Sequence, residues 1–205
     1  MQPRELRRRI ARTGIWAGIY IIAGGLVILG PGILGPGPAW SAAPGAPAHL
    51  RLVDRLDRPG DGYCLDIPGT PRNMRLDVPL FVHNCKPSLT SDSAVVFTSD
   101  GLIKFPAVER CMTVAGVNSG ALPGASILLR KCNESVPFFE TSKLQRFTLL
   151  DDGRLTVSGT QLCLTVGPRS AATYSSFDRW RTLFVDDCAA AEPARSRWEF
   201  VIPRP

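Results

Sequence analysis

The sequence predicts an all-β domain made of three repeats of about 50 residues, each closed by one disulfide. Three observations predict it. Six cysteines fall into three pairs of similar spacing, short apolar segments alternate in the manner of β-strands, and Asp-Gly turns join pairs of such segments. The same small unit is therefore expected to occur three times.

Length and composition indicate a single folded domain with short extra segments. The chain has 205 residues, 44% hydrophobic and 20% charged, which excludes a disordered chain and a multi-span membrane protein. The formal net charge of +6 comes from 24 basic and 18 acidic residues. Residues 1–41 hold five arginines and one glutamate, which leaves 19 basic and 17 acidic residues in the remainder. Because binding to nucleic acid needs a basic surface, no nucleic-acid partner is expected.

The N-terminal segment has the three parts of a secretory signal peptide. A basic stretch precedes an apolar run from Ile15 to Leu29, and small residues follow. Ala39 and Ser41 suit a cleavage site, so we expect a signal peptide over residues 1–41, a flexible linker over 42–51 and a secreted protein. The alternative is an uncleaved anchor whose domain faces outside the cytoplasm, because the run extended to Leu34 reaches about 20 residues.

All six cysteines lie after this segment and are expected to form disulfides. An even number of cysteines in an exported chain is typical of a disulfide framework. The separations of 21, 21 and 25 residues favour one bond in each repeat: Cys64 with Cys85, Cys111 with Cys132, and Cys163 with Cys188. No metal site is expected, because zinc needs clustered Cys and His, and the sequence has no Cys-x-x-Cys motif and only two histidines.

Matching strand patterns accompany the cysteines. Similar alternating segments surround the first cysteine of each pair: Tyr63–Ile67, Arg110–Val114 and Leu162–Val166. Asp100-Gly101 and Asp152-Gly153 each join two apolar runs, which is a strong hairpin signal. The third repeat ends without the corresponding turn and partner strand. We place the repeats at about 52–105, 106–157 and 158–205; units this small cannot bury an apolar face alone, so the three must share one core.

From Leu52 to Ile202 the sequence resembles the ricin-type β-trefoil lectins. The family's Cys-Leu-Asp motif is matched by Cys64-Leu65-Asp66, and its Gln-x-Trp motif by Gln145-Arg146-Phe147 with Phe for Trp and by Ser196-Arg197-Trp198 with Ser for Gln. The resemblance implies a β-trefoil. It also implies that the apolar residues at which the three repeats meet are Val95, Phe147 and Trp198.

The resemblance further implies one sugar site, in the first repeat. Such lectins resemble one another in using a carboxylate that accepts hydrogen bonds from sugar hydroxyls, an aromatic ring that stacks on the sugar, and an amide. Asp66 takes the carboxylate position and His83 the stacking position. Asp92 and Ser93 stand where the family has Asn-Gln, and Phe81 stands where a polar side chain is common. A simpler interpretation of Asp66 is a carboxylate at a strand edge beside a turn.

The other two repeats are expected to serve as scaffold, because neither has a carboxylate at the position of Asp66. The corresponding residues are Thr113, Arg130, Leu144 and Gln145 in the second repeat, and Thr165, Asp186, Arg195 and Ser196 in the third.

The expected function is that of a secreted, non-catalytic carbohydrate-binding module with at most one, weak sugar site, whose partners are glycans or glycoproteins. The alternative is a protein-interaction or toxin-accessory subunit that has kept the fold and lost sugar binding, because function belongs to sites rather than folds. Aromatic residues concentrate at interfaces. The candidate loops are Pro137–Lys143 and Ala171–Arg181, with Phe138, Phe139, Tyr174, Phe177 and Trp180.

Neither enzymatic activity nor a cofactor is expected. Nucleophilic catalysis needs a base beside the nucleophile, and the chain after the signal peptide has only His49 and His83. The adjacent acidic pairs Asp151-Asp152 and Asp186-Asp187 do not suit glycoside hydrolysis, because neighbouring strand residues point to opposite faces.

Overall fold

The computed structural model describes residues 43, 45–137 and 139–203. The predicted signal peptide and its cleavage point lie outside these residues. Within them, no helix combines the length and the hydropathy needed to cross a membrane.

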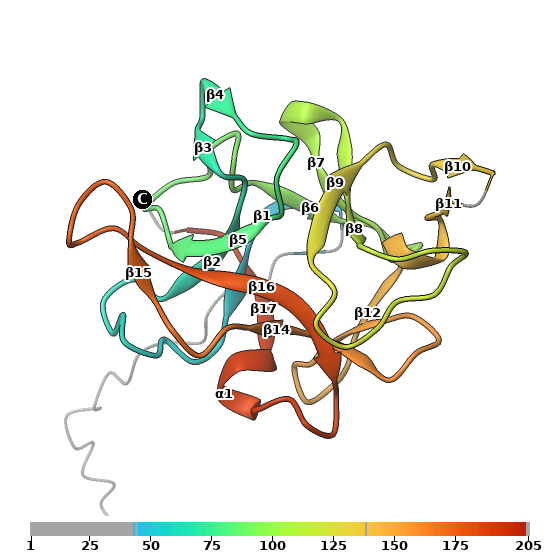
Figure 1. The fold of residues 1–205 in the computed structure, drawn as a ribbon. Coiled ribbons are helices and arrows are strands. Elements are labelled where there is room, and N and C mark those ends of the chain that lie inside the picture. The colour runs from blue at the N-terminus through green and yellow to red at the C-terminus, as the bar shows by residue number, and fades with distance from the viewer. Residues whose placement is uncertain (1–42, 44, 138, 204–205) are drawn as a thin grey trace, which may run out of the picture. The chain divides into compact units, whose positions relative to one another are not determined.

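Almost all regular elements of the described chain are short strands, drawn in Figure 1. The first repeat contains β1 (Pro47–Leu52), β2 (Tyr63–Asp66), β3 (Gly69–Thr70), β4 (Asn73–Met74), β5 (Phe81–Asn84), β6 (Val95–Phe97) and β7 (Ile103–Phe105). The second contains the 3-10 turn η1 (Pro106–Val108), β8 (Arg110–Val114), β9 (Ile127–Arg130), β10 (Ser135–Val136), β11 (Phe139–Glu140), the 3-10 turn η2 (Lys143–Gln145), β12 (Phe147–Leu149) and β13 (Leu155–Val157). The third contains β14 (Leu162–Val166), β15 (Ala171–Ala172), β16 (Arg179–Asp187), the short helix α1 (Pro193–Ser196) and β17 (Trp198–Val201).

The three disulfides occupy the same place in each repeat. They join Cys64 to Cys85, Cys111 to Cys132 and Cys163 to Cys188, with Cα atoms 4.9, 5.0 and 4.9 Å apart. Each closes an antiparallel pair, β2 with β5, β8 with β9 and β14 with β16. The predicted pairing is confirmed, and so is the prediction of an all-β fold.

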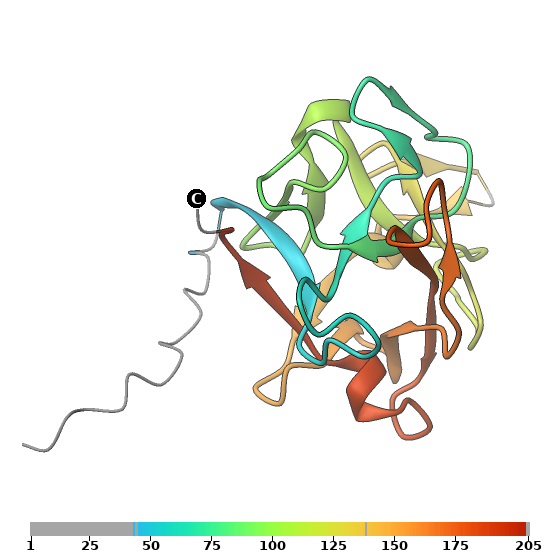
Figure 2. The same ribbon diagram turned by 90° about the vertical axis from the view of Figure 1, so that its left-hand side faces the viewer.

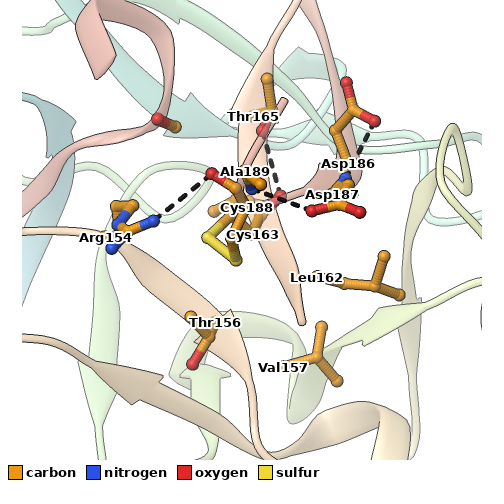
Figure 3. The surroundings of a disulfide bond; sticks show 12 residues. Arg154, Thr156, Val157, Leu162, Cys163, Thr165, Asp186, Asp187, Cys188 and Ala189 are labelled. Atoms are coloured by element: carbon orange, nitrogen blue, oxygen red, sulfur yellow. Dashed lines mark hydrogen bonds between the residues drawn. A yellow bond between two sulfur atoms is a disulfide. The ribbon is translucent and has the colours of Figure 1, made fainter. Parts of the chain in front are cut away.

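A side chain of the second repeat reaches the third disulfide, as Figure 3 shows. Arg154 donates a hydrogen bond to the backbone carbonyl of Cys188 at 3.3 Å. The adjacent Asp187 carboxylate accepts one from the amide of Ala189 at 2.8 Å. The second and third repeats are therefore tied together beside this bond as well as through the core.

Both predicted Asp-Gly hairpins form, between β6 and β7 and between β12 and β13. Gly101 has φ +84°, and a Cβ built there would lie 2.8 Å from the carbonyl oxygen of Phe147, so this turn requires glycine. The amide of Phe147 donates to the carbonyl of Gly101 at 2.8 Å, and the amide of Trp198 donates to that of Gly153 at 2.7 Å. Each turn thus anchors the core residue of the following repeat.

The first strand supplies the partner that the third repeat lacks. β1 pairs antiparallel with β17, and the two strands lie side by side in Figure 2. Arg51 and Glu199 form an ion pair at 2.7 Å across them. The expected linker over 42–51 is therefore wrong for residues 47–51, because the alternating Ala48 and Leu50 are fully buried and pair in the sheet. The physical reason is that β17 would otherwise be an unpaired edge.

His49 lies on the same strand and is also buried, rather than near a flexible start of the domain. Burial lowers the pKa of its imidazole. Among the described residues, neither ring nitrogen of His49 has a hydrogen-bond partner. Burial therefore favours the neutral form of the His49 imidazole.

One hydrophobic cluster joins all three repeats. Val95, Phe147 and Trp198 belong to it and are each at most 2% exposed. The indole NH of Trp198 also donates to the carbonyl of Leu164 at 2.9 Å. The predicted burial of these three residues is confirmed.

Replacing Phe147 by alanine tests the shared core. We expect the free energy of unfolding to fall by about 3–5 kcal/mol, because truncation leaves a cavity where repeats meet. The control is Leu149→Ala, in the same strand but exposed, for which the change should stay within about 0.5 kcal/mol. Urea unfolding followed by tryptophan fluorescence measures both, and a small, equal loss in the two variants would contradict the assignment.

Candidate functional site

A pocket of about 790 Å³ opens over the face of three paired strands, β2, β5 and β16. β16 belongs to the third repeat but pairs on one side with β14 and on the other with β5 of the first repeat (Figure 1). The pocket is lined by Asp66, Pro68, Gly69, Thr70, Pro71, Pro79, Leu80, Phe81, His83, Lys86, Asp92, Ser126, Thr173, Tyr174, Asp178, Trp180, Thr182 and Leu183. Long-range strand pairing therefore brings the first and third repeats to one site.

Two carboxylates share one ammonium group at the polar end of the pocket. Asp66 is the last residue of β2, and Asp92 lies in the turn before β6. The Nζ of Lys86 lies 2.8 Å from Oδ2 of Asp66 and 2.7 Å from Oδ1 of Asp92. The hydroxyl of Thr90 also donates to Oδ1 of Asp92.

Burial makes this group electrostatically unusual. Asp66 is 4% exposed and Asp92 only 1%. Desolvation raises the pKa of Asp66 to about 7, opposed chiefly by the charge of Lys86 and its hydrogen bond, while the charge of Asp92 adds to the rise. Among the described residues, Oδ1 of Asp66 and Oδ2 of Asp92 have no hydrogen-bond partner. These two oxygens are themselves buried, so one ammonium group leaves the pair of carboxylates incompletely satisfied.

The opposite part of the pocket is aromatic. The ring of Phe81 meets the ring of Trp180 edge-on at 6.0 Å and that of His83 at 5.9 Å. Nε2 of His83 lies 3.4 Å from the hydroxyl of Thr173. Burial lowers the pKa of His83, and the nearby charge of Lys86 lowers it further.

Four of the five residues selected from the sequence, Asp66, Phe81, His83 and Asp92, line this pocket. Ser93 is not among the lining residues. Its hydroxyl lies 2.8 Å from that of Thr90, and its amide donates to the carbonyl of Thr90. Ser93 thus serves the turn rather than the pocket, because a side chain buried in a tight turn bonds locally.

Sequence reasoning missed Lys86 as a member of the site. The signal was indirect: two acidic residues in apolar surroundings need a cation, and Lys86 directly follows Cys85, close to Asp92 in sequence. It also missed that Trp180 lies in the pocket wall, since the sequence assigned this residue to an interaction loop. Trp180 is instead in β16, opposite His83.

The remaining candidate loop residues are distributed differently. Tyr174 and Phe177 are 85% and 77% exposed, and only Tyr174 lines the pocket. In the other loop, Phe138 lies outside the described residues, while Phe139 belongs to β11, which pairs with β10.

In the second repeat, internal hydrogen bonds satisfy the side chains of Thr113 and Gln145. The amide of Gln145 donates to Thr113 Oγ1 at 2.9 Å and to the carbonyl of Lys131, while its oxygen accepts from the amide of Asn133. Leu144 is buried, and Arg130 lies 3.8 Å from Glu134. These residues hold the repeat together.

In the third repeat, the side chains at the corresponding positions bond to backbone groups of the same repeat. Thr165 donates to the carbonyl of Cys163 at 3.0 Å, and Asp186 accepts from the amide of Asp187, as Figure 3 shows. Arg195 donates to the carbonyl of Val166, and Ser196 to that of Glu192. Only the first repeat has an aspartate at the end of its cysteine-bearing strand.

Among the described residues, no three His, Cys, Asp or Glu side chains gather where they could hold a metal ion. The only cation at the carboxylate pair in the described chain is the ammonium of Lys86.

Three disulfide-closed repeats of short strands around one hydrophobic core define the β-trefoil class of fold. The family model of the ricin-type beta-trefoil lectin domain matches residues 54–175. The chain therefore belongs to this family, and the predicted resemblance and β-trefoil fold are confirmed. The structure adds the remainder of the third repeat, beyond the matched residues and through Val201.

Solved structures agree on the fold. The agglutinin from Abrus precatorius is 19% identical, with a TM-score of 0.53 over 78% of this chain and 50% of that chain. The mdaA-1 domain, a solution structure, is 14% identical, with a TM-score of 0.53 over 82% of this chain and 96% of that chain. This chain thus spans half the length of the agglutinin chain that it matches. No curated protein matches the chain.

The buried Asp66 predicts a pH-dependent stability that Asp66→Asn removes. Its pKa is about 7 against an ordinary 3.8, so the folded state binds the proton more tightly. Asp66 therefore contributes stability that is complete below about pH 4 and lost as the pH rises through about 7. As the pH rises from 4 to 8, the difference in unfolding free energy between Asp66→Asn and wild type should therefore shift by roughly 2–4 kcal/mol in favour of the variant.

Urea unfolding at several pH values measures this difference. Asp151→Asn, at an exposed position, serves as the control and should show a constant difference from wild type. A constant difference for Asp66→Asn as well would contradict the buried, proton-binding carboxyl group.

Proposed function

We propose that this domain is a non-catalytic carbohydrate-binding module with one sugar site, in the pocket of the first repeat. One observation carries the proposal: the carboxylate-bearing Asp66 lines the same pocket as the aromatic residues Phe81 and Trp180. Its membership of the ricin-type lectin family supports the same function.

The chemistry of the pocket fits a sugar. Hydroxyl groups donate to the carboxylates of Asp66 and Asp92, and Lys86 offers a donor to a sugar oxygen, since two of its three N–H groups face the carboxylates. The aromatic wall takes the apolar face of the ring. Such a shallow mixture of polar and apolar contacts gives millimolar to high-micromolar affinity, roughly −4 to −6 kcal/mol.

The position of Lys86 supports binding without catalysis. Glycoside hydrolysis requires two carboxyl groups that flank the scissile bond. Here the space between Asp66 and Asp92 holds the Lys86 ammonium, within 2.8 Å of both.

We infer that the domain works outside the cytosol, on glycans or glycoproteins. Three disulfides persist only in an oxidising compartment, and the N-terminal sequence has the pattern of a secretory signal.

A glycan array with the purified, oxidised protein tests the proposal. Wild type should bind a restricted class of glycans, and Asp66→Ala should lose that binding. Thr113→Ala, at the equivalent position of the second repeat, is the matched control and should bind as wild type does. Unchanged binding by a folded Asp66→Ala variant would place the site elsewhere.

A second candidate function is contact with a protein partner. The observation that favours it is Phe177, which is 77% exposed and lies outside the pocket lining. Large exposed aromatic side chains are typical of binding surfaces. Partner binding that free sugar does not compete with, and that Phe177→Ala removes, would favour this function over the first.

A further inference from the structure

The pocket is larger than one sugar ring requires. Pockets of roughly 300–1,000 Å³ hold drug-sized ligands, whereas a hexose has only about twelve non-hydrogen atoms. The volume here is about 790 Å³. A single ring held by Asp66 leaves most of this space unfilled.

The strand register separates the polar and aromatic parts of the pocket. Asp66 lies opposite Phe81, and Phe81 lies opposite Thr182 on the next strand. Residues directly opposite one another in antiparallel strands share a face of the sheet. Trp180 is two residues from Thr182 in β16 and so lies on that same face.

Asp66 and Trp180 are therefore two strands apart. Strands in a sheet are spaced by about 4.8 Å and residues along a strand by about 3.4 Å, so an offset of two strands and two residues puts the two backbone positions roughly 12 Å apart, with Phe81 on the strand between them. A sugar ring whose hydroxyls bond to Asp66 lies over Phe81 and does not cover Trp180 as well.

The aromatic wall also continues outward. Phe81 and Trp180 are half-buried, while Tyr174 at the pocket edge is 85% exposed. The ring of His83 is smaller than that of Trp180, and its Nε2 already lies 3.4 Å from the hydroxyl of Thr173. Trp180 presents the largest ring for stacking in the pocket lining.

We propose that Trp180, contributed by the third repeat, forms a second sugar subsite, so that the pocket takes an oligosaccharide of at least two rings. The inner ring bonds to Asp66, the second ring stacks on Trp180, and Tyr174 borders the direction in which the glycan leaves. This inference rests on the proposed sugar-binding function and adds to it the size of the ligand.

Calorimetric titration of the oxidised protein with matched probes tests the second subsite. The probes are glucose with cellobiose, galactose with lactose, xylose with xylobiose, and N-acetylglucosamine with its β-linked dimer. For the sugar class that binds, the disaccharide should bind about tenfold more tightly than the monosaccharide, the gain expected from one stacked ring. Trp180→Ala should reduce that ratio to about one, and Trp180→Phe should restore part of it.

Phe177→Ala is the matched control, because Phe177 is an exposed aromatic residue near Trp180 that does not line the pocket. It should retain the wild-type ratio. Thermal unfolding verifies that each variant is folded.

The outcomes separate the two proposals. Equal affinity for monosaccharide and disaccharide, or a wild-type ratio in Trp180→Ala, overturns the second subsite and leaves the Asp66 site in place. Absence of binding to all eight sugars by the folded protein contradicts the proposed function and this inference together.

Discussion

The burial of apolar side chains that no single repeat can cover is the constraint on which the structure depends. Val95, Phe147 and Trp198 come from three different repeats and lie in one hydrophobic cluster. Phe147 and Trp198 are also tied to the preceding repeat, since the glycine carbonyl of its Asp-Gly turn accepts the amide of each. All three repeats therefore contribute side chains to one core, and the strands of each repeat must be arranged around it.

Closure of the fold follows from the same constraint. β17 carries Trp198 into the core but has no hairpin partner of its own, and β1 at the other end of the chain completes the pair. The bond between Arg51 and Glu199 spans this junction. The pair of β1 and β17 is therefore the counterpart of the hairpins β6–β7 and β12–β13, with its two strands at opposite ends of the domain.

The three repeats share a backbone plan but differ where chemistry is possible. Thr113 and Thr165 donate their hydroxyl protons to a backbone carbonyl two residues earlier, and neither side chain carries the charge of a carboxylate. Asp66 occupies the same position but has no hydroxyl group. Its buried carboxylate instead forms an ion pair with Lys86, which also pairs with Asp92. Burying charge is costly unless it is paired, and one ammonium for two carboxylates pairs them incompletely. That incomplete pairing distinguishes the first repeat from the other two.

By itself the sequence determined the repeats, the three disulfides and both Asp-Gly hairpins, because each depends on local spacing and alternation. The three buried core residues were indicated by the resemblance to the lectin family. It also selected Asp66, Phe81, His83 and Asp92, which line one pocket. Only the tertiary structure decided that Lys86 lies between two carboxylates, that Ser93 faces its own turn, and that Trp180 joins the pocket. The physical reason is that β16 pairs with β5 across two repeats, and no local pattern in a sequence specifies such a long-range register.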